Sequence, residues 1–166
     1  SACLLTLGWM LALQASATEV QPPSTKKVYC GVLDSFGGQV EILDSSRKQV
    51  LSLSSKLALP CGSWVSVDQG WAQWRDERGN SVQAVDGTFV QLPEVAGDPN
   101  GSATLLKGQI LVRLAEGQPE FKVETATARA RAKSASFLMT FVQQTGETQV
   151  VSLAGETSLE NRFQDS

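Results

Sequence analysis

The sequence predicts an all-β protein of stacked short antiparallel strands, arranged as a β-sandwich or in a β-solenoid-like manner. Polar and apolar residues alternate along many short segments, which is the period of a strand with one buried face. Glycines recur roughly every eight to twelve residues, as they do where short strands are joined by tight turns. Beyond the N-terminal apolar run, no segment carries a helical apolar stripe of useful length.

The alternation locates the individual strands. It runs through Val40 and Ile42 in one segment, and through Ile110, Val112 and Leu114 in another. Further strands are predicted in 63–68, where Trp64 or Val65 alternates with Val67, in 80–92, in 145–161 and, as two strands with a polar corner, in 45–59.

Glycine dipeptides are expected to divide these segments. Asp86-Gly87 is a tight-turn pair that splits 80–92 into two strands. In the same way, Gly146-Glu147 and Gly155-Glu156 are predicted as turns around the last strands.

The strongest break in the pattern lies near 94–104, where two turn-forming pairs follow one another. The segments on either side resemble each other, each having a glycine, alternating apolar residues and then paired strands. We therefore expect a single β domain over 27–166, made of two half-repeats that share one core.

Composition narrows the class of function. The chain has 166 residues and a net charge of −3, so it is long enough for one domain and carries no overall basic field for nucleic acid. It contains no histidine, which excludes Ser-His-Asp and Cys-His catalysis and His-ligated zinc. We expect no enzymatic activity, no cofactor and no metal.

The first residues are typical of an export signal. An apolar run is followed by Ala15-Ser16-Ala17, a small-x-small site of the kind that signal peptidase cleaves. The basic residues that usually precede such a run are missing. We interpret 1–17 as a signal peptide cleaved after Ala17 and 18–26 as a polar leader. The protein would then be periplasmic or secreted, with membrane attachment only if the signal is retained as an anchor.

Cleavage would remove Cys3 and leave Cys30 and Cys61. An even number of cysteines in an exported chain favours a disulfide, and we expect these two to be bridged. Two unpaired buried thiols are the alternative.

The segment 121–139, "FKVETATARARAKSASFLM", carries three regularly spaced cations. If one strand register ran through it, Arg129, Arg131 and Lys133 would point into the core, which is prohibitively costly without partners. We therefore expect a bent strand whose register slips near Thr125-Ala126 and again near 134–135. Small residues then face inward, namely Ala126, Ala128, Ala130 and Ala132, followed by Phe137, Met139 and Phe141.

The three cations would then form a solvated outer face, and a docking site for an acidic partner is the alternative. Trp71 and Trp74 are a second candidate site, because paired indole rings can stack on sugar. Their spacing of three places them on opposite faces of a strand, so at least one belongs to the core. Four carboxylates, those of Asp68, Asp76, Glu77 and Asp86, lie at turns without the spacing of a metal or catalytic site.

The second half of the chain resembles the periplasmic FecR domain. That family's pattern reads roughly F-x-V-x-T-P-x-A-x-A-x-V-R-G-T-x-F-x-V and then G-x-T-x-V-x-V-L-x-G-x-V-x-V-x-N. Matching residues are Phe121, Val123, Thr125, Ala128, Ala130, Phe137, Gly146, Thr148, Val150, Leu153, Gly155 and Asn161. The first half fits more loosely, through Gly62, Val65, Gly70, Ala72, Asp86 and Gly87.

The resemblance is divergent. Ala126 stands where the family has proline, Ser134-Ala135 replaces its Gly-Thr, and Lys133 replaces its arginine. It implies a non-catalytic interaction or signalling domain of the bacterial cell envelope with an envelope protein as partner. A carbohydrate- or peptidoglycan-binding module is the alternative function, with a glycan as ligand.

Overall fold

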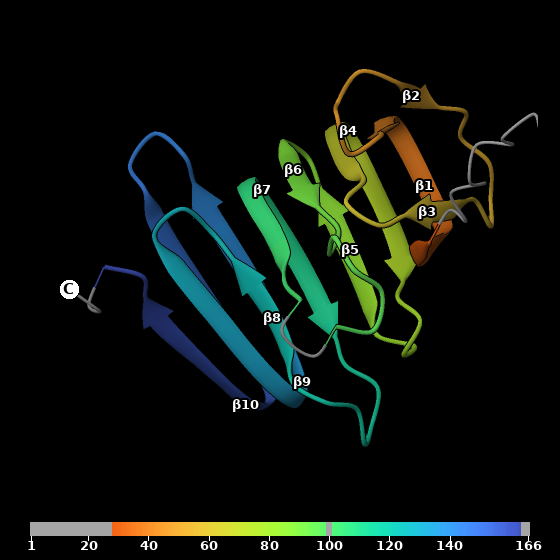
Figure 1. Ribbon diagram of the computed structural model, residues 1–166. Helices are drawn as coiled ribbons and strands as arrows, with labels where there is room; N and C mark the ends of the chain where they lie inside the picture. The colour runs from red at the N-terminus through yellow and green to blue at the C-terminus, as the bar shows by residue number, and fades with distance from the viewer. Residues whose placement is uncertain (1–27, 99–100, 164–166) are drawn as a thin grey trace, which may run out of the picture.

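A computed structural model describes residues 28–98 and 101–163, and every regular element in this part of the chain is a β-strand (Figure 1). The prediction of an all-β protein with antiparallel strands is therefore confirmed. The predicted signal peptide, its cleavage site at Ala17 and the leader 18–26 lie outside the described residues. No helix in the described part of the chain is long and apolar enough to cross a membrane.

The strands are β1 (Tyr29–Leu43), β2 (Val50–Leu51), β3 (Ala58–Pro60), β4 (Trp64–Arg75), β5 (Ser81–Val85), β6 (Thr88–Gln91), β7 (Ala103–Arg113), β8 (Phe121–Glu124), β9 (Ala128–Val142) and β10 (Glu147–Asn161). They form one sheet with the order β10-β9-β8-β7-β5-β4-β1-β2. β3 also pairs with β1, and β6 pairs with β4 and β7, so that β4, β5, β7 and β6 close a small four-stranded circuit. Nearly all pairings are antiparallel; β7 and β8 run parallel.

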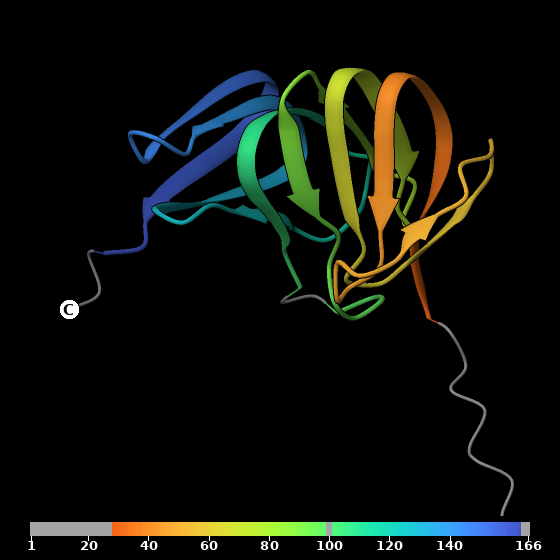
Figure 2. The same ribbon diagram turned by 90° about the horizontal axis from the view of Figure 1, so that it is seen from above.

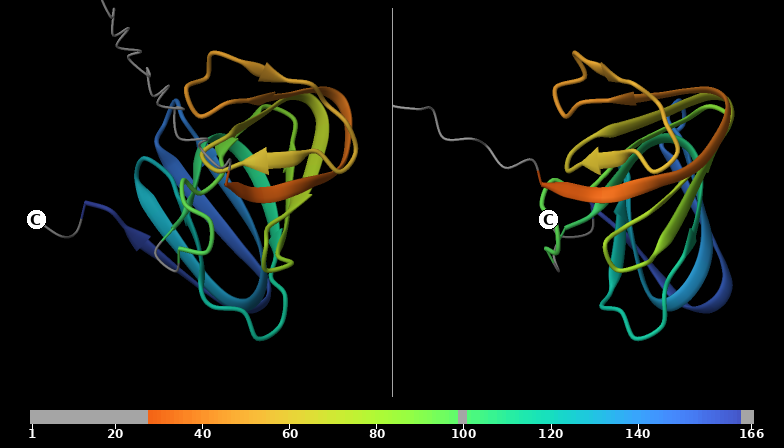
Figure 3. Two further views of the ribbon diagram at one scale, coloured as in Figure 1. Left: turned by 45° about the vertical axis from the view of Figure 1, so that its right-hand side comes forward. Right: turned by 90° about the vertical axis from the view of Figure 1, so that its right-hand side faces the viewer.

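The long strands curl over, as Figures 2 and 3 show for β1 and β4. Gly38 of β1 and Gly70 of β4 pair directly at the bend, and both have positive φ. A Cβ on Gly70 would collide with the carbonyl oxygen of Gly37. Only glycine fits this close, left-handed backbone, so glycine placement folds the sheet on itself.

Asp86-Gly87 forms a turn between two strands, β5 and β6, as predicted, but the two strands do not make a hairpin. β5 and β6 do not pair with each other; both pair antiparallel with β4 and with β7. They are two halves of one strand position, interrupted where the Asp86 carboxylate accepts a hydrogen bond from the backbone N–H of Gly70. The dipeptide thus continues the bend of β1 and β4 into the next strand.

Gly155-Glu156 is not a turn, so this prediction is wrong. β10 runs through it as one strand of 15 residues, with register shifts between Ser152 and Ala154 and between Ala154 and Glu156. Gly155 has φ of 71° and forms a bulge. Gly146, in contrast, does lie in the turn that connects β9 to β10, as predicted.

The first register slip in 121–139 is a reversal of the chain. β8 and β9 pair antiparallel, with Val123 opposite Ala130, so the segment is a hairpin followed by a bent strand. Ala126 lies in the turn and is exposed, so its predicted inward position is wrong. The other inward positions are confirmed, because the alanines at 128, 130 and 132 and then Phe137, Met139 and Phe141 are buried.

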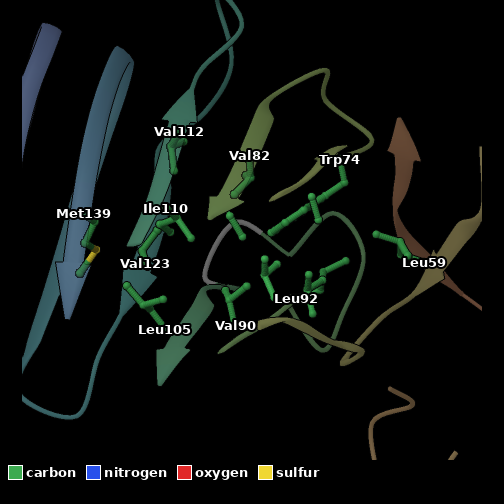
Figure 4. Close-up of a cluster of buried hydrophobic side chains, with 14 of the residues drawn as sticks. Leu59, Trp74, Val82, Val90, Leu92, Leu105, Ile110, Val112, Val123 and Met139 are labelled. Atoms are coloured by element: carbon green, nitrogen blue, oxygen red, sulfur yellow. The ribbon is translucent and has the colours of Figure 1, made fainter. Parts of the chain in front are cut away.

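A single buried cluster joins all parts of the sheet. Figure 4 shows its side chains converging from β3, where Leu59 lies, to β9, where Met139 lies. Val65 belongs to this core, whereas Trp64 is buried on the opposite face, stacked on Phe89 and covered by the guanidinium of Arg47. The break near 94–104 falls in the connection from β6 to β7; the half-repeats stay a prediction.

Cys30 and Cys61 form a disulfide, as predicted, with their Cα atoms 4.7 Å apart. The bridge ties the start of β1 to the segment between β3 and β4. It therefore fastens the short strands at this end of the sheet to the core.

Candidate functional site

The most distinctive surface is the free edge of β10. This strand pairs with β9 and with no other strand of the described residues, so the backbone groups along its outer side have no strand partner (Figure 1). It also exposes large apolar side chains: Val151 is 51% exposed, Leu153 60% and Leu159 46%. A long, apolar edge strand is a template for pairing with another strand.

The opposite end of the sheet is built differently. There β2 has two residues and β3 has three, and β3 ends in Pro60. Short strands and proline are common means of preventing edge-to-edge association. β2 and β3 cover the two ends of β1 and leave its middle open, whereas β10 has no strand of the described residues along any part of its outer side.

Within β10 the edge is best suited to pairing over 148–154, "TQVVSLA". This stretch contains no charge and is rich in residues that favour strands, while Glu147 and Glu156 flank it. Register shifts between Ser152 and Ala154 and between Ala154 and Glu156 mark the end of this stretch and separate it from the second half of the strand. The sequence pattern identified a strand here but could not show that it lies at the edge.

The outer face of the sheet adds an apolar row to this edge. Leu111 of β7 lies opposite Leu138 of β9, and Leu138 lies opposite Val151 of β10. The two leucines are partly covered, whereas Val151 at the end of the row is half-exposed. The row therefore stops abruptly at the sheet edge.

The predicted basic row lies on the outer face, but most of it is paired. Arg129 Nε donates to Glu124 at 2.6 Å, and Arg131 approaches Glu160 of β10 at 3.2 Å. Both arginine side chains are about one-third exposed, while Lys133 is exposed. The expectation of a simple solvated row thus holds for Lys133 but not for the two arginines. The glutamates also neutralise most of the charge that an acidic partner would recognise.

The two tryptophans do not form a platform. Trp74 is buried in the core at 4% exposure, and Trp71 lies on the other face at 36%. The indole of Trp71 packs over Gly37 of β1, where a Cβ would lie 3.1 Å from its Nε1. Its position is explained by covering this glycine, and the structure does not bring the two rings together.

A cluster of hydroxyl groups joins the two turns that flank β9. Thr148 Oγ1 lies 2.9 Å from Thr125 Oγ1 and 2.9 Å from Thr127 Oγ1. Thr125 is buried and accepts a hydrogen bond from the N–H of Ala128 at 3.0 Å. Thr125 and Thr148 thus hold β10 against the β8–β9 turn.

The acidic side chains serve turns and ion pairs. Asp76 accepts hydrogen bonds from the backbone N–H groups of Arg78 and Asn80 at 2.9 Å each. The Arg75 guanidinium donates to Asp34 at 2.7 Å, and this hydrogen bond raises the pKa of Arg75. Among the described residues no group of three or more His, Cys, Asp or Glu side chains could hold a metal ion.

Comparisons of the chain with protein-family models, with curated proteins and with solved structures find no match. The free edge of β10 is thus the candidate site that the geometry itself provides.

Proposed function

We propose that the protein is a non-catalytic interaction and signalling domain of the bacterial cell envelope, which binds protein partners by strand addition along β10. The observation that carries the proposal is this 15-residue strand, which is paired on one side only and exposes Val151 and Leu153. In strand addition, backbone hydrogen bonds supply affinity and alternate side chains supply specificity.

Two further features support the envelope location. The Cys30–Cys61 disulfide is of the kind that persists in oxidising compartments such as the periplasm. Ser134, which occupies the position of a glycine in the FecR pattern, has φ of 45°, a conformation that favours glycine. This conformation supports the proposed resemblance, because it is one that the glycine of the family pattern adopts easily.

The test is covalent capture from defined positions. A photo-crosslinking amino acid replaces Val151 in β10 or, as a matched control, Val50 in β2 at the opposite end of the sheet. Both are exposed valines near a sheet edge, 51% and 56% exposed, so they differ mainly in the length of the edge around them. The variants are expressed in a bacterial host and irradiated in intact cells.

The proposal expects a discrete cross-linked product from position 151, either with another protein or with a second copy of this chain. It expects no such product from position 50. Adducts of equal yield from both positions, or none from either, would contradict it. Retention of the unirradiated protein on purified peptidoglycan, with no adduct, would instead favour the glycan-binding alternative.

A further inference from the structure

We infer that β10 pairs with β10 of a second copy, joining two sheets into one continuous sheet across a twofold axis at Val151. This inference rests on the proposed function, and it identifies a second copy of the chain as a partner that binds the β10 edge. A twofold axis perpendicular to the sheet makes the two β10 strands antiparallel and keeps both outer faces on one side.

The first argument is the apolar row that ends at the edge. With Val151 opposite Val151 of the second copy, the row Leu111–Leu138–Val151 continues into its own symmetry mate. The half-exposed Val151 is then covered by an identical side chain. A register that placed Val151 opposite Gln149 would break the row.

The second argument is charge. β10 contains three glutamates and no lysine or arginine, so many registers bring like charges together. Counted along the sequence with Val151 on the axis, Glu147 falls at Gly155 of the other copy, in the irregular part of its β10, and Glu156 falls at Gly146 in the other copy's turn. Because glycine has no side chain, each carboxylate can turn toward water. The neutral stretch 148–154 then lies beside the same stretch of the second copy.

The third argument is the length of the regular ladder. Register shifts between Ser152 and Ala154 and between Ala154 and Glu156 interrupt the strand at the end of this stretch, and the β9–β10 turn lies just before it. The paired segment therefore ends at each side where the partner's chain changes direction. Beyond the bulge, Leu159 would lie opposite Gln143 in the partner's turn, outside the ladder.

The experiment measures the mass of the full chain by sedimentation equilibrium over a range of concentrations up to the order of 100 μM, where even a weak dimer forms. Val151→Lys is compared with Leu159→Lys, which is the same type of change at a similarly exposed apolar residue of the same strand. Both variants are first checked for an unchanged denaturant midpoint, which excludes misfolding.

We expect the unaltered chain and Leu159→Lys to dimerise, and Val151→Lys to weaken the dimer at least tenfold. In a Cys3→Ser background, Val151→Cys should form a disulfide-linked dimer, since directly opposite Cα atoms lie about 4.5–5.5 Å apart in such pairs. Leu159→Cys should not, because its symmetry mate is remote.

A chain that stays monomeric, a dimer that Val151→Lys leaves intact, or equal cross-linking at 151 and 159 would overturn the inference. If the chain is monomeric but position 151 still cross-links to a different protein in cells, only the pairing with a second copy is overturned, and the proposed function stands. Absence of both dimer and adduct would contradict the proposed function as well.

Discussion

Ser134 and Gly155 meet where β9 and β10 bend together, and a Cβ on Gly155 would lie 2.5 Å from the carbonyl oxygen of Ser134. Both residues have positive φ, 45° for Ser134 and 71° for Gly155. The bend divides β10 into the neutral stretch 148–154 and an acidic half, so this contact defines the edge on which the functional proposal depends.

Replacing Gly155 with alanine should destabilise the protein by more than about 2 kcal/mol. The left-handed backbone alone costs a residue with a Cβ about 1–2 kcal/mol, and the contact with Ser134 adds to it. Gly87→Ala is the matched control, because Gly87 has φ of 73° but no atom within 4 Å of its Cβ position. Denaturant unfolding compares the two variants. Equal losses would show that the close approach of the strands is unimportant.

Ser134→Gly should have the opposite effect and stabilise the protein by about 0.5–1 kcal/mol, because the relief of left-handed strain exceeds the entropy cost of glycine. Ser136→Gly, two residues further along the same strand, lacks this strain and should destabilise the protein by a similar amount. The two unfolding midpoints should therefore move in opposite directions. A loss of stability in Ser134→Gly would mean that the serine side chain is needed at the bend.

Changes to the basic row should cost less than changes to the alanines behind it. Gln at 129, 131 and 133 removes two partly exposed ion pairs, each worth about 0.2–1 kcal/mol. Ala130→Leu adds three carbons at a fully buried position and should cost about 1–3 kcal/mol. Denaturant unfolding of the triple variant and of Ala130→Leu tests the order. If the triple variant were the less stable, the two arginines would be structural.

Reduction of the Cys30–Cys61 disulfide should lower stability by about 3–4 kcal/mol, because the bridge restricts an unfolded loop with a sequence separation of 31. Unfolding with and without reductant gives the difference. In unreduced, unfolded protein, a thiol reagent should label Cys3 where that residue is retained, and neither of the bridged residues. Labelling of Cys30 or Cys61 in that sample would contradict the bridge.

The sequence was informative wherever the deciding interactions were local. Alternation alone predicted that Val40 and Ile42 are buried, and the cost of burying cations placed Ala128 and Ala130 inward. Cysteine count and the expected export predicted the disulfide.

Gly155 was misinterpreted, because a glycine with positive φ fits both a tight turn and a bend within a strand. Only the neighbouring strands decide between these. Gly155 lies where β10 bends together with β9. At this glycine the sequence therefore predicted a turn where the structure has one long, bent strand.

The site could not be predicted, because an edge is a property of strand order. The sequence of 147–161 does not indicate that β10 pairs with only one strand of the described residues. The residues around Arg131 do not indicate that Glu160 lies beside it. Both facts depend on pairings between segments far apart in the sequence.

Amide hydrogen exchange tests the central claim, strand addition at β10, most directly. Exchange is measured in dilute free protein and in the assembly that forms, whether a dimer or a complex with a captured partner. The account predicts that the hydrogen-exchange rates of amides within 148–154 fall at least tenfold on assembly, because an added strand protects the backbone groups of a free edge. The exchange rates of amides in β2 should not change. Assembly that leaves 148–154 unchanged and protects another surface would contradict the account.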